Sequence, residues 1–230
     1  MPDFVVEFGD GGEPPSDGRL RGPAFDRNHE PIWSVIAPFL AERTGDVLEV
    51  GSGTGQHVVA YARRSPGVTW WPSDLNARHL ASIAAWRAHA ELPSIQAPAR
   101  IDLLEADWDS DLPMQDRLLA IVCINVLHIS PWRVTENLLA GAGRRLRPEG
   151  RLFVYGPFRR DGAHTAPSNA TFDASLRSQN AEWGVRDTAD IAAAAGYCGL
   201  RVADIVQMPA NNFTLAIAPA PSIARGDCNH

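Results

Sequence analysis

Three alternating glycines, Gly51, Gly53 and Gly55, form the strongest candidate for a ligand-binding loop in this sequence. The segment reads Glu49-Val-Gly-Ser-Gly-Thr-Gly, so an acidic residue stands two positions before the first glycine. Glycines let a backbone pass close to a ligand, and a helix that begins after them presents unpaired N–H groups to it. The spacing differs from the dinucleotide fingerprint G-x-G-x-x-G, because the third residue after Gly53 is Gln56. The chain has no lysine, which excludes a phosphate-binding G-x-x-x-x-G-K-[ST] loop.

Polar residues also close three later apolar runs, where the strands of an α/β sheet would end. Asp74 lies twenty-three residues after Gly51, and a carboxylate there can accept hydrogen bonds from both hydroxyls of a ribose. Asp107 can accept a bond from the amino group of a purine, while the indole of Trp108 covers the face of the base. Asn125 stands near the end of the next run. Ligands of open α/β sheets bind outside the carboxyl ends of the strands, so these positions are expected to converge on one site.

The elements that must position these residues alternate between strand and helix patterns. Strands are expected at residues 46–50, 68–72, 101–106, 118–126 and 151–155, and helices at 32–42, 56–64, 76–91 and 133–146. Such alternation predicts parallel β-α-β units with right-handed crossovers. The last third predicts helices at 171–179 and 188–195 and an antiparallel edge hairpin of strands 201–206 and 213–217. The predicted fold class is α/β, with about seven mostly parallel strands and helices on both faces.

The composition bounds the class of protein. The chain has 230 residues, of which 45% are hydrophobic and 21% charged, as expected for one large globular domain. The formal net charge of -6 argues against a nucleic-acid-binding face. All 21 basic residues are arginine, so a Schiff-base lysine and a lysine general base are excluded. The three cysteines lie far apart and no H-x-H or H-E-x-x-H occurs, so neither a disulfide framework nor a metal site is expected.

Both ends of the chain are rich in turn-forming residues. Residues 1–24 are expected to form an N-terminal arm, residues 25–218 the folded domain and residues 219–230 a flexible tail. The first residues have no basic start and no long apolar stretch, as a secretory signal would. No window reaches the roughly 18 apolar residues of a membrane span. A cytoplasmic protein without a membrane partner is therefore expected.

Taken together, the glycine motif, Asp74, Asp107 and the two-helix, two-strand ending resemble the class I S-adenosylmethionine-dependent methyltransferases over about residues 25–218. The resemblance implies a Rossmann-like fold with a seven-stranded sheet, S-adenosylmethionine as cofactor and S-adenosylhomocysteine as product. It also implies that the glycine motif shapes a methionine pocket, Asp74 holds the ribose, Asp107 holds the adenine and Asn125 borders the sulfonium. The cofactor contacts it implies are Arg27, Asn28, Glu49, Gly51, Ser52, Gly53, Gly55, Asp74, Leu75, Asp107, Trp108 and Asn125.

A narrower resemblance, to the DUF938 or methyltransferase-like 26 group, rests on ordered motifs along the chain. They include Arg27-Asn28-x-x-Pro31-Ile32, Ser52-Gly53-Thr54-Gly55-Gln56-His57, Asn125-x-Leu127-His128-Ile129, Tyr155-Gly156-Pro157-Phe158, Ser168-Asn169-x-x-Phe172-Asp173, Trp183-Gly184-x-Arg186-Asp187 and Met208-Pro209-Ala210-Asn211-Asn212. This group supports the cofactor more firmly than any substrate. The chain departs from it in its first twenty or so residues and in its proline-alanine tail.

Three residues are candidates for catalysis, each with a structural alternative. His128 follows the fourth strand and suits a general base, or it is a loop histidine that caps a helix or bonds a carbonyl. Tyr155 ends the fifth strand on the same edge of the sheet, or it is an ordinary half-buried aromatic. Asp173 and Arg177 are spaced for a local ion pair on one helical face, although the family resemblance places them beside the pocket.

Residues 157–187 are expected to form a lid and most of the substrate wall. The predicted substrate contacts are Trp132, Asn169, Arg177, Arg186, Asn211 and Asn212. Arg186 is suited to an anionic group of the substrate or the cofactor, whereas Asp187 or Thr188 serves more simply as a helix N-cap. The two asparagines also fit a plain turn. Arg27 could clamp the methionine carboxylate or belong to a solvated arm.

The functional hypothesis is therefore methyl transfer to a small-molecule acceptor by in-line displacement, which needs alignment and desolvation more than acid–base chemistry. The acceptor atom can be O, N or S, and a base is needed only where the acceptor must lose a proton. One alternative is a non-catalytic methyltransferase-like partner subunit. Another is a protein or RNA methyltransferase, which the acidic net charge disfavours.

Overall fold

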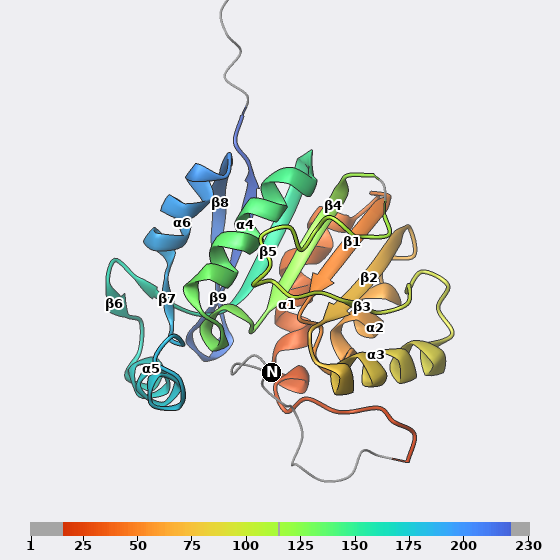
Figure 1. Ribbon diagram of the computed structural model, residues 1–230, viewed down its shortest axis with the longest axis horizontal. Coiled ribbons are helices and arrows are strands. Elements are labelled where there is room, and N and C mark those ends of the chain that lie inside the picture. Colours follow the sequence, from red (N-terminus) through yellow and green to blue (C-terminus); the bar gives the residue numbers. More distant parts are fainter. Residues whose placement is uncertain (1–15, 115, 222–230) are drawn as a thin grey trace, which may run out of the picture.

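The computed structural model describes residues 16–114 and 116–221, which form a single sheet covered by helices on both faces (Figure 1). The sheet has the strand order β3-β2-β1-β4-β5-β9-β8, and the short strands β6 and β7 pair with β5 beside it. The strands are β1 (Gly45–Val50), β2 (Val68–Asp74), β3 (Ala99–Arg100), β4 (Leu118–Ile124), β5 (Leu146–Arg160), β6 (Ala163–His164), β7 (Arg186–Asp187), β8 (Leu200–Met208) and β9 (Asn212–Pro219). The helices are α1 (Phe25–Leu40), α2 (Gln56–Ala62), α3 (Ala77–Ala90), η1 (Leu127–Ile129), α4 (Trp132–Arg145), α5 (Pro167–Gln179), α6 (Thr188–Tyr197) and η2 (Pro209–Asn211).

The centre of the sheet is parallel and its last two strands are antiparallel. β1 pairs in parallel with β2 and β4, and β4 pairs in parallel with β5. β9 runs antiparallel to both β5 and β8. Every residue of β4 is buried, as its unbroken apolar sequence requires of a strand covered on both faces. The α/β fold with a C-terminal antiparallel hairpin is confirmed.

Two hydrophobic clusters lie on opposite faces of the sheet. One joins α1 and α2 to the sheet, with Ile32, Ile36 and Leu40 buried at helical spacing along α1. The other joins α4 and α6 to the opposite face. In Figure 1, α4 and α6 lie in front of the sheet and α1 lies behind it. A ligand at the ends of the central strands can therefore meet residues from both helical layers.

Three elements differ from the sequence expectation. The third strand, expected at 101–106, is only the two residues of β3, because Asp102 accepts a bond from the Leu104 N–H and turns the chain. α1 begins at Phe25, so Arg27 lies inside the helix and not ahead of it. β5 begins at Leu146, five residues before the strand expected at 151–155, and its pairing with β4 contains a register shift between Leu118 and Ala120.

The segment just before α1 packs on the domain. Leu20 is buried, its N–H donates to Ser82 Oγ at 2.9 Å, and its carbonyl accepts from Trp86 Nε1 at 2.9 Å. Gly22 N–H donates to Gln56 Oε1 at 2.6 Å. Residues 16–24 of the expected arm therefore belong to the body of the molecule. Residues 1–15 of that arm, and 222–230 of the expected tail, lie outside the described residues.

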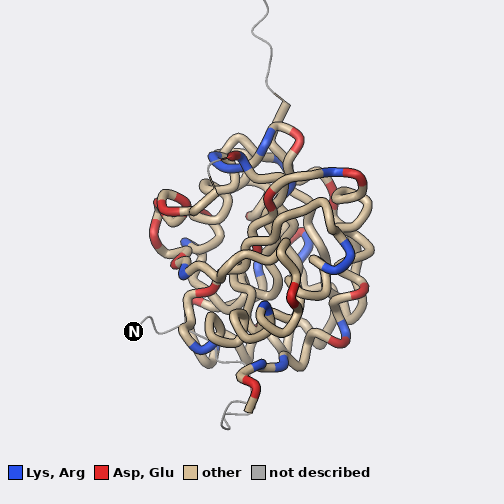
Figure 2. Tube along the Cα trace, turned by 90° about the vertical axis from the view of Figure 1, so that its right-hand side faces the viewer, with Lys and Arg blue, Asp and Glu red and all other residues tan. Residues whose placement is uncertain are grey.

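Along the Cα trace in Figure 2, positions of both charge signs are interspersed and do not gather into a stripe of one sign. Among residues 16–114 and 116–221, no helix has the length and apolar character needed to cross a membrane. The cytoplasmic location stays a prediction.

Candidate active site

The glycine loop between β1 and α2 adopts a backbone that only glycine accepts easily. Gly51, Gly53 and Gly55 have φ values of 64°, 55° and 88°, all in the left-handed region. A Cβ on Gly51 would stand 2.6 Å from Cγ2 of Val126, and a Cβ on Gly55 would stand 3.0 Å from Cα of Ile83. All three glycines therefore supply the left-handed backbone of the loop, and Gly51 and Gly55 also allow it to lie close to Val126 and Ile83.

Asp74, at the end of β2, fixes this loop. Its Oδ2 accepts from the Gly53 N–H at 2.8 Å, and its Oδ1 accepts from the Asn76 N–H at 2.9 Å. The same Oδ1 lies 3.2 Å from Nδ1 of buried His79. The carboxylate is nearly buried yet still lines a pocket, so it both holds the loop and borders that pocket.

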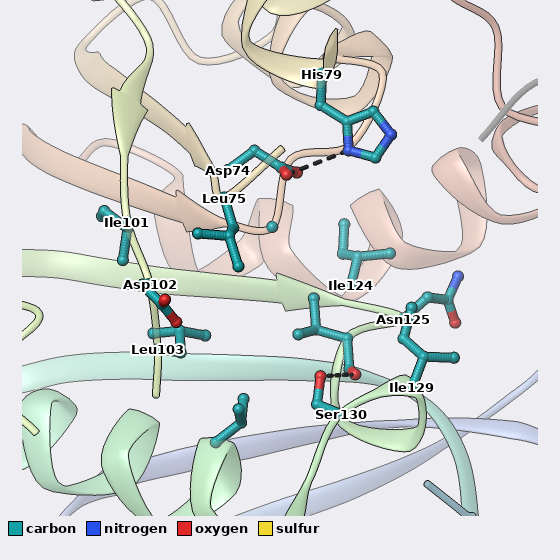
Figure 3. Close-up of a pocket in the computed structure, with 13 residues that line it drawn as sticks. Asp74, Leu75, His79, Ile101, Asp102, Leu103, Ile124, Asn125, Ile129 and Ser130 are labelled. Carbon is teal, nitrogen blue, oxygen red and sulfur yellow. Dashed lines mark hydrogen bonds and ion pairs between the residues drawn. The ribbon is translucent and has the colours of Figure 1, made fainter. Parts of the chain in front are cut away.

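The first pocket, called here the β2–β4 pocket, opens between the ends of β2 and β4. Figure 3 shows Asp74 and Leu75 at the end of β2, Asp102 in the chain after β3, and Asn125 with Ile129 in the chain after β4. Its lining residues are Gly51, Asp74, Leu75, His79, Ile101, Asp102, Leu103, Ile124, Asn125, Val126, Ile129, Ser130 and Val134. Apolar walls with two carboxylates at the rim suit a flat base and a ribose.

The second pocket, called here the glycine-loop pocket, lies above the glycines on the α1 side. Its lining residues are Gly22, Pro23, Ala24, Phe25, Glu49, Gly51, Ser52, Gly53, Thr54, His57, Ile124 and Asn125. Residues 22–24 were assigned to the arm from the sequence, so their place in this wall was missed. Glu49 is the acidic residue among those that line the glycine-loop pocket.

Glu49 is almost fully buried and one of its oxygens is unsatisfied. Its Oε2 has no hydrogen-bond partner within residues 16–114 and 116–221. Burial, opposed by a hydrogen bond with Ser52 and assisted by the nearby charge of Asp74, raises the pKa of Glu49 to about 8. The group is therefore an uncharged acid at neutral pH, with one oxygen left to receive a donor.

The third pocket, called here the α5 pocket, is the largest of the three and encloses about 1650 Å³ including its open mouth. It lies between α1, β5, η1, α5 and η2. Its lining residues are Ala24, Arg27, Asn28, Asn125, His128, Ile129, Tyr155, Pro157, Asn169, Phe172, Leu176, Gln179, Trp183, Pro209, Ala210 and Asn212. The segment 157–187 supplies much of this wall.

Asn125 lies where the three pockets meet, because it lines each of them. Its φ of 59° is left-handed, a conformation that asparagine tolerates better than most residues. Its N–H donates to the Tyr155 carbonyl at 2.9 Å, which ties the junction to β5. The predicted position of Asn125 at the end of the fourth strand matches this place in the structure.

His128 lies in η1 and faces the α5 pocket. The residue is buried, and its ring meets that of Phe172 edge to face at a centroid distance of 5.5 Å. Burial, together with the charge of Arg186, lowers the pKa of His128 to about 4. The imidazole is therefore neutral at pH 7 and able to accept a proton.

Arg186 holds the loop that carries His128. Its guanidinium donates to the carbonyls of Leu127, Ser130 and Glu182, at 3.1 Å to the first and 2.8 Å to the last. The guanidinium also stands 5.9 Å from the ring centre of Trp132. Neither Arg186 nor Trp132 lines any of the three pockets, so the structure gives both a supporting position in place of the predicted substrate contact.

Asp173 and Arg177 form the local ion pair that the sequence predicted as the alternative to a role beside the pocket. Asp173 Oδ2 accepts from Arg177 Nε at 3.1 Å, and its Oδ1 accepts from the Val185 N–H at 2.7 Å. Burial alone would raise the pKa of Asp173, but these bonds and the arginine charge outweigh it and lower the pKa. Neither residue lines the three pockets, so the arrangement joins α5 to the chain before β7.

The remaining predicted substrate residues gather around the α5 pocket. Asn169 donates from Nδ2 to the Asn211 carbonyl at 2.9 Å, which joins α5 to η2. Asn169 and Asn212 line the pocket, whereas Asn211 reaches it only through this bond. Burial raises the pKa of Tyr155, against the opposing effects of an Asn212 bond and the Arg27 charge.

Arg27 and Asn28, expected on the cofactor, line the α5 pocket and not the glycine-loop pocket. They occupy the first turn of α1. Asn28 is buried, and its Oδ1 lies 2.9 Å from Nε2 of His57. Burial lowers the pKa of His57 to about 3, so a neutral imidazole holds this asparagine in place.

Asp107 and Trp108 do not lie where the sequence placed them. Trp108 is buried in the core, packs on Gly141 of α4 and donates from Nε1 to the Asn137 carbonyl at 2.9 Å. Asp107 is exposed in the loop, and neither residue is among those that line the three pockets. The carboxylate that lines the β2–β4 pocket there is Asp102. The apolar residues on both sides of Asp102 made it look like the inside of a strand.

Solved structures share this fold at low sequence identity. An O-methyltransferase family protein from Burkholderia thailandensis is 18% identical with a TM-score of 0.72, over 86% of this chain and 57% of that chain. CalO1, a methyltransferase in calicheamicin biosynthesis in its SAH-bound form, is 19% identical with a TM-score of 0.64, over 85% and 60%. Human N-acetylserotonin methyltransferase in complex with SAM is 13% identical with a TM-score of 0.67, over 86% and 53%.

These likenesses show that the chain has the class I methyltransferase fold. The chain spans between half and two-thirds of the length of each of those proteins. The model of one family, described as a protein of unknown function (DUF938), matches residues 19–218. That match begins inside the segment which packs against α3 and ends within β9, so it covers nearly all of the fold described above. The chain therefore belongs to the DUF938 family.

Proposed function

We propose that this protein is an S-adenosylmethionine-dependent methyltransferase that acts on a small molecule by in-line displacement. The observation that carries the proposal is the meeting of three pockets at Asn125, above a left-handed glycine loop. Two pockets suit the two halves of the cofactor, and the third suits an acceptor. The shared fold with proteins solved in SAH-bound and SAM-bound forms supports the same reading.

The residues present fit the cofactor. The β2–β4 pocket offers apolar walls and the carboxylates of Asp74 and Asp102 for the adenosine, and the glycine-loop pocket offers buried Glu49 for the methionine end. The unsatisfied Oε2 of Glu49 is suited to the donor that an α-ammonium group provides. S-adenosylmethionine bound there supplies an electrophilic methyl group on a positively charged sulfur.

The chain's own residues would align the acceptor and take up its proton. Asn125 borders all three pockets, so a methyl group passed from cofactor to acceptor would cross beside it. His128 faces the acceptor side, and its neutral imidazole can accept a proton from a hydroxyl or amine. Phe172 and Trp183 help to exclude water from that side.

Calorimetric titration with S-adenosylmethionine tests the proposal. We expect the wild type to bind, and Gly51→Ala to weaken binding at least about tenfold, because the new Cβ would displace Val126 and strain the loop. Gly196→Ala is the matched control, since a Cβ at that helical position meets nothing within 4 Å. Absence of binding by the wild type would sink the proposal. Binding without turnover of any acceptor would favour a non-catalytic partner subunit.

A further inference from the structure

The α5 pocket has an unusual charge for this acidic chain. Of the described residues that line it, only Arg27 carries a fixed charge, and no carboxylate is present. No ion pair involves Arg27 within the described part of the chain, whereas Arg177 and Arg186 are both engaged elsewhere. The lining of this pocket is therefore positively charged, although the net charge of the whole chain is -6. The pocket is built to receive a negatively charged or neutral group and to disfavour a cation.

Apolar atoms make up the larger part of the exposed pocket wall. Phe172 keeps 41% of its surface exposed although it is a large aromatic residue, and its ring stands against that of His128. Trp183 is buried, and its Nε1 has no hydrogen-bond partner among the described residues. Pro157 and Leu176 add apolar surface. Aromatic and aliphatic side chains of this kind suit a planar ring.

The two polar ends of the pocket come from opposite sides of the sheet. Arg27 lies on α1, which packs on one face, and His128 lies in η1, which leads into α4 on the other. A Cβ on Gly156 would stand 3.3 Å from Nδ1 of His128 and 3.9 Å from Oδ1 of Asn125. The imidazole therefore lies beside the junction of the three pockets, where the methyl group would arrive.

We propose, on the basis of the proposed methyltransferase function, that the acceptor is a planar aromatic compound carrying both a hydroxyl and a carboxylate. The ring lies against Phe172 and Trp183, the carboxylate pairs with Arg27, and the hydroxyl faces His128. The acceptor oxygen forms a bond to the methyl carbon as the bond from that carbon to sulfur breaks. The bonding pair stays on sulfur, which becomes a neutral thioether, and the hydroxyl proton moves to the His128 imidazole.

The test uses three hydroxy acids that place the two groups at different separations: 3-hydroxybenzoate, 4-hydroxybenzoate and 4-hydroxycinnamate, each with its primary amide as a neutral match. Binding to the full-length protein saturated with S-adenosylhomocysteine is measured by calorimetry, and methylation by product formation. We expect at least one acid to bind about tenfold more tightly than its amide and to be methylated on its hydroxyl.

Variants at arginine separate the acceptor from the cofactor. Arg27→Gln is expected to remove the preference for the acid while the affinity for S-adenosylhomocysteine stays unchanged. Arg63→Gln is the matched control, because Arg63 is exposed at the end of α2 and lines none of the three pockets.

Three results would overturn the inference. If S-adenosylhomocysteine binds but no acid binds better than its amide, the acceptor class is wrong and the methyltransferase proposal stands. If Arg27→Gln weakens the binding of S-adenosylhomocysteine, Arg27 serves the cofactor. If the wild type binds no S-adenosylhomocysteine, the proposed function and this inference fail together.

Discussion

At the scale of single residues, the sequence predicted the place of Glu49 in the glycine loop but not its raised pKa. Its place two residues before the glycines marked it as part of the loop. Its protonation depends on the depth at which β1 buries it, and on Asp74 from the neighbouring strand. The burial of Glu49 and the proximity of Asp74 both depend on tertiary packing, so the raised pKa could not be predicted from the sequence.

This raised pKa predicts how stability changes with pH. An unfolded Glu49 ionises near its ordinary value of 4.5, whereas the folded protein keeps the proton until about pH 8. The contribution of protonated Glu49 to the free energy of unfolding is therefore fully present below pH 4.5 and is lost as the pH rises toward 8. Glutamine does not titrate, so the free energy of unfolding of Glu49→Gln minus that of the wild type should increase from pH 5 to pH 8. Urea unfolding at both pH values measures this, and a difference that is independent of pH would contradict it.

Two aspartates separated by only five positions give a second prediction. Asp102 lines the β2–β4 pocket, and Asp107 is exposed outside it. We expect Asp102→Ala to weaken the binding of S-adenosylmethionine about tenfold, because a polar partner of the adenosine is lost. Asp107→Ala serves as the matched control and should bind like the wild type. The reverse order of effects in calorimetric titrations would restore Asp107 as the adenine contact.

At the scale of elements, Arg186 joins two segments that the sequence keeps far apart. One guanidinium donates to carbonyls on both sides of His128 and to Glu182. The Gly184 N–H adds a bond to the His128 carbonyl at 3.0 Å. The chain before β7 therefore holds η1, and Arg186 is a positioning residue for His128.

Removing this support should alter both the rate and its pH dependence. Arg186→Gln removes a positive charge that helps to lower the pKa of His128, so the acidic limb of kcat/KM should move to higher pH. Loosening of η1 should lower kcat about 10- to 100-fold while the Kd for S-adenosylmethionine is unchanged. Arg186→Lys keeps the charge without the planar fork, and should lower kcat with the acidic limb in place. Equal pH profiles for all three proteins would show that Arg186 does not act through His128.

The same scale explains which sequence predictions failed. Strand and helix alternation placed β1, β2, β4 and α2 well, because their patterns are long or bounded by glycines. The third strand failed because an Asx-type turn at Asp102 outweighed its apolar neighbours. This shift left Asp102, rather than Asp107, at the pocket. The start of α1 was missed by seven residues, and Arg27, expected on the cofactor, lines the α5 pocket.

At the scale of the whole molecule, the site belongs to no single layer. α1 and the segment before it close one side, the carboxyl ends of β2 and β4 form the floor, and α5 with η1 closes the other. The sequence predicted the floor, since it follows from the alternation of strands and helices. It could not predict the closure, because contacts such as Leu20 with Ser82 and Asn169 with Asn211 join positions far apart in the chain.

The pairing of β5 with β7 has a consequence for how this protein can diversify. Phe158 lies opposite Arg186, and Arg159 lies opposite Asp187, so the excursion between them leaves and rejoins the fold at neighbouring points. That excursion carries α5 and five of the residues that line the α5 pocket, while the glycine loop and the β2–β4 pocket lie wholly outside it. A graft between residues 161 and 182 would therefore reshape one side of the α5 pocket and leave Arg27, His128 and the two other pockets unchanged.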